Sequence, residues 1–121
     1  MSEILAGQRG ALEGEELLLR ASLDVEHGRP RAAAVGLQAG IELASAELSA
    51  GVAKEALRKV AGPAAALARA ARSGALDTVQ RAELERLLTV AELALGDWRA
   101  QEPAAAPAGA RTSEIAEAGS P

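Results

Sequence analysis

The chain has almost no aromatic side chains, and this limits the core that it can build. Among its 121 residues there is no Phe and no Tyr, Trp98 is the single Trp, and hydrophobic residues make up 49% of the chain. Alanine supplies much of that fraction, and burying a methyl group yields far less free energy than burying Leu or Phe. The length and the 25% of charged residues are typical of one globular domain. We therefore expect a single small core built from Ala and Leu.

The same composition disfavours most catalytic chemistry. His27 is the only His and there is no Cys, so few side chains are available as nucleophiles, as metal ligands or as platforms on which nucleic-acid bases stack. The lack of Cys excludes a disulfide framework and thiolate zinc sites. We expect a protein that binds other molecules, with no cofactor and no metal.

Charge gives no indication of a nucleic-acid partner. The chain has 13 basic and 17 acidic residues, for a net charge of −4, and the two signs are mixed along the sequence. Binding to nucleic-acid phosphates is driven by clustered cations. We therefore expect no DNA or RNA partner.

The N-terminal residues do not read as a targeting signal. Residues 1–7 have Glu3 where a signal peptide needs a cationic start, and no stretch is long and apolar enough to span a bilayer. We expect a cytoplasmic protein with no membrane partner. Lysine occurs only at Lys54 and Lys59 while arginine is common, which indicates a GC-rich bacterial genome.

Apolar residues recur at helical spacing between Gly and Pro residues, and strand-like alternation is absent. His27 and Gly28 are typical of a helix end, and Asp77 is a plausible N-cap. At Gly62 and Pro63 a helix is expected either to kink or to restart. The first predicted helix begins between Ala11 and Glu15 and ends at His27–Gly28, and the second runs from about Pro30 to Ser49. The third runs from Val52 through Val60 and continues from Ala64 to Arg72. The fourth runs from Asp77 to about Gln101.

These elements predict an all-α fold, an antiparallel bundle of about four helices over residues 11–101. Residues 1–10 are expected to be a mobile N-terminus, and residues 102–121 a disordered tail rich in Ala, Pro and Gly.

Small residues in the second predicted helix indicate a close helix contact. Gly36 and Gly40 each cost about 1 kcal/mol relative to Ala in a helix interior, and close packing compensates for that cost. The alternative explanation is that the helix tolerates Gly36 and Gly40 without any close contact. Small domains often gain burial by pairing with a copy, so we expect a homodimer, with another protein as a further candidate partner. The predicted interface residues are Gly36, Gly40, Ile41, Leu84, Leu88, Leu95 and Trp98, the last of which has the alternative role of closing the base of the bundle.

Residues 17–43 resemble a tetratricopeptide repeat hairpin. Gly28 occupies the turn, Ala21 suits the small position of the first helix, and Ala33 and Gly40 suit those of the second. Asp24 stands where the repeat has a large apolar side chain, Ser45 replaces the closing proline, and no second copy follows, so no solenoid is expected. The resemblance implies protein–protein interaction.

Arg20 and His27, with six residues between them, are similar to the Arg and His signature of HEPN-type ribonucleases. That resemblance implies a dimeric bundle in which Arg20 holds an RNA phosphate and His27 moves a proton. Ala21 departs from the polar residue usual in that family, and the acids Asp24 and Glu26 would repel the substrate.

Three further hypotheses use different side chains. A harder cation is conceivable at Asp24 and His27, but exposed acids at a helix start ordinarily serve the helix dipole. Paired carboxylates on the fourth helix are conceivable as an acid–base set, but solvated charges are commoner there. Space between helices would hold a small apolar ligand in a closed pocket lined by Leu and Val. The acids concerned are Glu13, Glu15 and Glu16 for the cation, and Glu83, Glu85 and Glu92 for the acid–base set.

Overall fold

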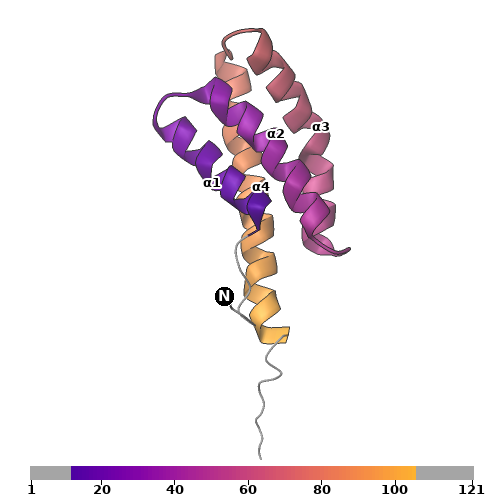
Figure 1. Ribbon diagram of the computed structural model, residues 1–121. Helices are drawn as coiled ribbons and strands as arrows, with labels where there is room; N and C mark the ends of the chain where they lie inside the picture. The colour runs from indigo at the N-terminus through magenta and orange to yellow at the C-terminus, as the bar shows by residue number, and fades with distance from the viewer. Residues whose placement is uncertain (1–11, 106–121) are drawn as a thin grey trace, which may run out of the picture. The chain divides into compact units, whose positions relative to one another are not determined.

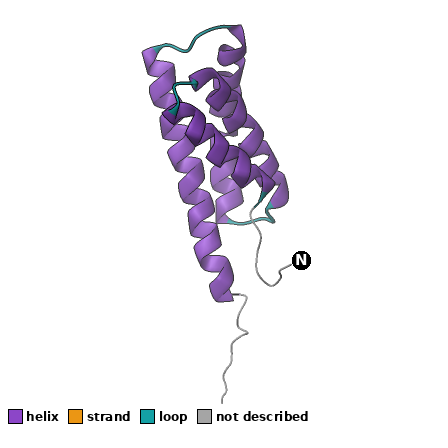
Figure 2. Ribbon diagram, turned by 60° about the vertical axis from the view of Figure 1, so that its left-hand side comes forward, coloured by secondary structure: helices purple, strands orange, loops and turns teal. Residues whose placement is uncertain are grey.

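The computed structural model describes residues 12–105, with side chains through Gln101. Every regular element in that range is a helix (Figures 1 and 2). The all-α class and the expected four helices are confirmed for these residues. The helices are α1 (Glu13–Glu26), α2 (Pro30–Glu47), α3 (Val52–Ser73) and α4 (Thr78–Ala105).

The described residues fall into two units, Ala11–Leu95 and a second unit of which residues 96–105 are described. In the unit Ala11–Leu95, short loops join helices that alternate in direction, and α2 packs against both α1 and α3 (Figure 1). Short loops favour antiparallel neighbours. In residues 96–105, α4 continues as helix, and the guanidinium of Arg99 lies 5.3 Å from the centre of the Trp98 ring.

The core of the unit Ala11–Leu95 consists of Ala, Leu, one Ile and one Val, and no polar or charged side chain among the described residues is buried. Alanines fill the positions where helices approach closely, and leucines fill the space between them. This is the kind of core that the composition predicts. The largest fully buried side chains are Leu18, Leu37, Ile41, Leu57, Leu84, Leu87 and Leu95.

The helix ends follow their local sequence. Gly28 adopts φ +73°, the left-handed conformation that Gly tolerates best, and Pro30 takes the first position of α2, where a missing N–H costs nothing. At α4, the N–H of Gln80 donates to Oδ1 of Asp77 over 2.7 Å, and the N–H of Asp77 donates to Oε1 of Gln80 over 2.9 Å. This reciprocal capping box places the start of α4 where Asp77 predicted it.

Three boundaries differ from the predicted ones. Helix α2 ends at Glu47 and not at Ser49, because Leu48 turns to an extended conformation with ψ 144°. Helix α3 continues through Pro63 from Val52 to Ser73, so the chain does not restart there. Helix α4 extends past Gln101 to Ala105. The predicted mobile residues 1–10, and all of the predicted tail after Ala105, lie outside the described residues.

Within residues 12–105, none of the helices has both the length and the apolar character needed to cross a bilayer.

Candidate functional site

Helices α1 and α2 meet most closely near the start of α1. A Cβ atom on Gly14 would lie 2.3 Å from the backbone N of Ala44 and 2.6 Å from the carbonyl O of Gly40. A Cβ atom on Gly40 would lie 2.8 Å from Cγ of Leu18. All three distances are well below ordinary van der Waals separation, so the helices can approach this closely only because neither position carries a side chain. We call this contact of Gly14 with Gly40 and Ala44 the sealed end of the α1–α2 pair.

A carboxylate also holds the sealed end. Glu47, the last residue of α2, accepts hydrogen bonds from the backbone N–H groups of Glu13 and Gly14, each over 2.9 Å. Leu12 occupies the N-cap position of α1 and provides no capping bond of its own. The first N–H groups of a helix lack intrahelical partners and favour negative charge, so Glu47 supplies from α2 the cap that α1 lacks.

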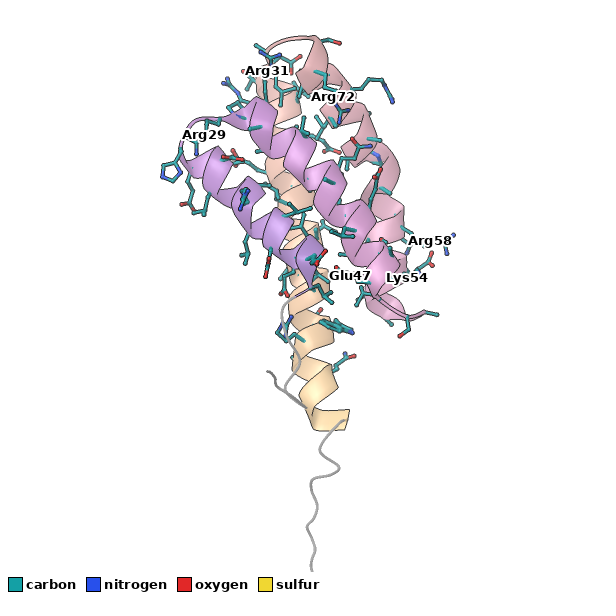
Figure 3. The ribbon with its side chains drawn as sticks, viewed as in Figure 1. Arg29, Arg31, Glu47, Lys54, Arg58 and Arg72 are labelled. Carbon is teal, nitrogen blue, oxygen red and sulfur yellow. The ribbon has the colours of Figure 1, made fainter. Side chains whose placement is uncertain are left out.

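At the opposite end of the same helix pair the surface opens into a groove of about 500 Å³. Three helices contribute to it, namely the second half of α1, the start of α2 and the end of α3, and Figure 3 shows Arg31 and Arg72 at this end of the molecule. We call it the arginine groove. It is lined by Leu17, Arg20, Ala21, Asp24, Arg31, Ala32, Val35, Gly36, Ala71 and Arg72.

The floor of the arginine groove is made of small and aliphatic residues. Gly36 of α2 faces Ala21 of α1, and a Cβ atom on Gly36 would lie 3.5 Å from Cβ of Ala21, an ordinary van der Waals contact. Leu17 and Val35 also belong to the lining. The uncharged part of the lining is therefore small or aliphatic, and an apolar group can lie against it.

Arg31 is the groove arginine whose side chain makes a hydrogen bond. Its Nε–H donates to the carbonyl O of Ala71 over 2.7 Å, and so ties the start of α2 to the last turn of α3. The last carbonyl groups of a helix lack intrahelical partners and favour a positive charge. Arg31 therefore has a structural role in addition to lining the groove.

Arg20 and Arg72 have no such anchor. Both side chains are exposed, and no hydrogen bond or ion pair joins either of them to another residue in the part of the chain that the structure describes. Their guanidinium groups stand on α1 and α3, with the floor of the groove between those helices. They are the cations that a bound acid would meet without displacing an existing partner.

One acid lines the groove, and it is already paired. Oδ1 of Asp24 lies 3.1 Å from Nε of Arg29, which stands outside the lining. The lining thus has three arginines against one carboxylate that another arginine neutralises, while the whole chain carries a net charge of −4. The groove has the opposite sign from the chain that forms it.

The predicted interface residues separate into three groups. Gly40 lies at the sealed end, and Gly36 lies in the floor of the arginine groove. Trp98 is half-buried and belongs to the second unit, beside Arg99. The remaining four are buried within the core of this chain, namely Ile41, Leu84, Leu88 and Leu95.

Arg20 and His27 are not brought together at the groove. Arg20 lines it, whereas His27 is absent from the lining and its Nδ1 lies 2.8 Å from the carbonyl O of Leu23, at the exposed end of α1. Seven residues of helix correspond to about 10 Å along the axis. A ribonuclease that uses Arg20 and His27 stays a prediction.

The geometry gives little support to a metal site or to a closed ligand pocket. Among the described residues, no three His, Cys, Asp or Glu side chains are grouped closely enough to hold a metal ion. The groove is open, and Arg, Asp, Ala and Gly outnumber Leu17 and Val35 in its lining.

Of the three glutamates considered as an acid–base set, Glu83 and Glu92 have separate bonding partners. Both carboxylate oxygens of Glu83 accept hydrogen bonds from Arg86, at 2.9 and 2.8 Å, and this bonding lowers the pKa of Glu83. The stabilisation is present at neutral pH and is lost as the pH falls through the lowered pKa. Glu92 instead accepts a hydrogen bond from the hydroxyl of Ser22 on α1. The geometry gives Glu83 an ion-pairing role and Glu92 a role in joining two helices.

The sequence did not single out Arg31 or Arg72. They are 41 residues apart, and each on its own is an ordinary surface arginine. Their positions could have predicted that they lie close together, since Arg31 stands at a predicted helix start and Arg72 at a predicted helix end. In adjacent antiparallel helices, the start of one helix lies beside the end of the other.

No family model matches the chain, and no curated protein and no solved structure is found to be similar to it. The resemblance of residues 17–43 to a tetratricopeptide hairpin therefore stays a prediction.

Proposed function

We propose that the protein is a cytoplasmic helical interaction module that associates with copies of itself and binds an acidic segment of a protein partner in the arginine groove. One observation carries the proposal: α1, α2 and α3 each contribute an arginine to one groove with an apolar floor. The arginines support an acidic ligand, and the apolar floor supports an aliphatic side chain in that ligand.

The arginines favour carboxylates as the polar part of the ligand. A guanidinium group presents a planar set of N–H donors that match a carboxylate in two parallel hydrogen bonds. Arg20 and Arg72 have no partner among the described residues, so binding a carboxylate breaks no existing bond at either position. The single acid of the lining, Asp24, is already paired with Arg29 and repels the ligand less than an isolated carboxylate would.

The floor favours a peptide with an aliphatic side chain between its acids. Gly36 and Ala21 leave the centre low, and Leu17 and Val35 present apolar surface beside it. Interfaces gain most of their free energy from such central apolar contacts, with charged groups at the rim. A partner segment that alternates acidic and aliphatic residues satisfies both parts of the groove.

The test is binding of a labelled peptide of glutamate and leucine to the full chain, followed by fluorescence anisotropy. We expect saturable binding that weakens with added salt, because the contacts at the rim are charged. Arg72→Glu should weaken it about tenfold or more, since a hydrogen-bonded charge pair becomes a repulsion. A peptide with lysine in place of glutamate should not bind.

Arg58→Glu is the matched control. Arg58 is exposed, lies on α3 well away from Arg31 and Arg72 in Figure 3, and makes only a surface ion pair of 3.3 Å with Glu55. It changes the net charge by the same amount as Arg72→Glu. Equal weakening in both variants would contradict a specific groove. Binding of a labelled single-stranded RNA, lost in Arg72→Glu while the acidic peptide fails to bind, would overturn the protein partner in favour of phosphate.

A further inference from the structure

The two stretches of sequence outside the described residues differ in charge. Residues 1–11 contain one acid, Glu3, and one base, Arg9, whereas residues 106–121 contain two acids, Glu114 and Glu117, and one base, Arg111. Those two acids flank an aliphatic residue in the run Ser113-Glu114-Ile115-Ala116-Glu117-Ala118. We call this run the 113–118 segment. It has the composition that the arginine groove favours.

We propose that the 113–118 segment of one chain occupies the arginine groove of a second copy, and that this contact produces the self-association. The inference rests on the proposed function, because it uses the same groove and the same chemistry. It names the partner, which is another copy of this chain.

The segment and the groove match in number and kind of groups. Glu114 and Glu117 supply two carboxylates, and Arg20 and Arg72 are the two groove arginines that have no partner among the described residues. Ile115 lies between the two acids in the sequence, as the apolar floor lies between the two arginines. Charge complementarity of this kind fixes the register of a bound segment and selects it over neutral ones.

We place the segment in the groove of a second copy, because a contact within one chain would not join two molecules. A contact within one chain gives a mass that does not change with protein concentration, whereas a contact between copies gives a mass that rises with it. The experiment therefore measures mass against concentration.

The experiment measures the mass of the full chain by sedimentation velocity over a range of concentrations. We expect the unmodified chain to shift from monomer towards dimer as its concentration rises. Glu114→Arg with Glu117→Arg removes the ligand, and Arg20→Glu with Arg72→Glu removes the receptor. Each double variant should need at least about tenfold more protein for the same degree of association. Glu3→Arg, in the stretch with no net charge, is the matched control and should associate as the unmodified chain does.

Mixing the two double variants identifies the contact. The chain with reversed groove arginines still has a normal 113–118 segment, and the chain with reversed glutamates still has a normal groove. We expect the mixture to form a 1:1 complex at concentrations where each variant alone is monomeric. In the mixture, the normal segment of one variant meets the normal groove of the other, and the reversed segment meets the reversed groove, so opposite charges face each other in both contacts.

Three outcomes overturn the inference: a monomer at every concentration, association that the glutamate reversals do not change, and a mixture that forms no complex. The glutamate–leucine peptide separates these from failure of the proposed function. If that peptide binds the chain and loses affinity in Arg72→Glu, the groove function stands while the 113–118 segment is excluded as its ligand. If neither the peptide nor the segment binds, both proposals fall.

Discussion

The two ends of the α1–α2 pair are built from the same kinds of small residue and differ in outcome. At the sealed end Gly14 and Gly40 bring two backbones into contact, and a Cβ atom on Gly14 would lie 2.3 Å from the N of Ala44. At the groove end Gly36 faces Ala21, and its Cβ atom would have 3.5 Å to the nearest atom. One end has no room for a side chain at Gly14, and the other has room for a methyl group at Gly36.

The difference comes from what stands opposite each glycine. Gly40 faces another glycine and a buried leucine on α1, so the helices close on each other. Gly36 faces an alanine, whose methyl group keeps the backbones further apart, and α3 adds Ala71 and Arg72 beside the opening. Glycines four residues apart on one helix therefore have separate roles, one in packing and one in shaping a surface.

The largest effect is expected from Gly14→Ala. The new methyl group would lie 2.3 Å from the backbone N of Ala44 and 2.7 Å from its Cα, and backbone atoms cannot move aside without separating the helices. Overpacking of this kind costs about 3 kcal/mol or more. The free energy of unfolding, measured in urea, gives the value. Alanine in place of glycine gains about 1 kcal/mol of helix propensity, which offsets only part of that cost. A net loss of stability below about 1 kcal/mol would therefore mean that α1 does not approach α2 this closely.

Gly40→Ala should have a smaller effect at the same end. Its Cβ atom would lie 2.8 Å from Cγ and 2.9 Å from Cδ2 of Leu18, which is a side chain and can change rotamer, and 3.0 Å from the carbonyl O of Gly14. Strain of about 1–3 kcal/mol is offset in part by about 1 kcal/mol of helix propensity. Urea unfolding should therefore show a net loss of up to about 2 kcal/mol. A gain in stability would contradict the sealed end.

Sequence patterns predicted these helices well and their contacts only in part. The spacing of leucines and the residues Gly28, Pro30 and Asp77 located the helix starts and ends, because capping and turn conformations depend on residues close in sequence. The close contact of α2 was expected around Gly36 and Gly40 without its partner Gly14, which in the sequence marks only the region where the first helix begins. The arginine groove was missed, because it requires knowing that the start of α2 and the end of α3 lie side by side.

Glu47→Gln tests how much of the sealed end depends on the cap. A glutamine presents one acceptor oxygen where the carboxylate presents two, so one of the bonds to the N–H groups of Glu13 and Gly14 is lost together with the charge. We expect a loss of about 1 kcal/mol in urea unfolding. Glu42→Gln, which alters an exposed glutamate on the same helix bonded only to Gln38 at 3.0 Å, is the control and should change stability little. Equal losses in the two variants would remove the capping role from Glu47.

Gly36→Ala should have the smallest effect on stability and the opposite sign. The new methyl group meets Cβ of Ala21 at 3.5 Å, an ordinary contact, so the substitution keeps the packing and gains up to about 1 kcal/mol of helix propensity. The same methyl group raises the floor of the arginine groove, so affinity for the glutamate–leucine peptide should fall while urea unfolding shows equal or greater stability. Gly40→Ala, four residues further along α2, should give the reverse result, with lower stability and unchanged peptide affinity in the folded fraction. If Gly36→Ala instead destabilises the chain as Gly40→Ala does, the groove end is closed in solution, and the contrast between the two ends does not exist.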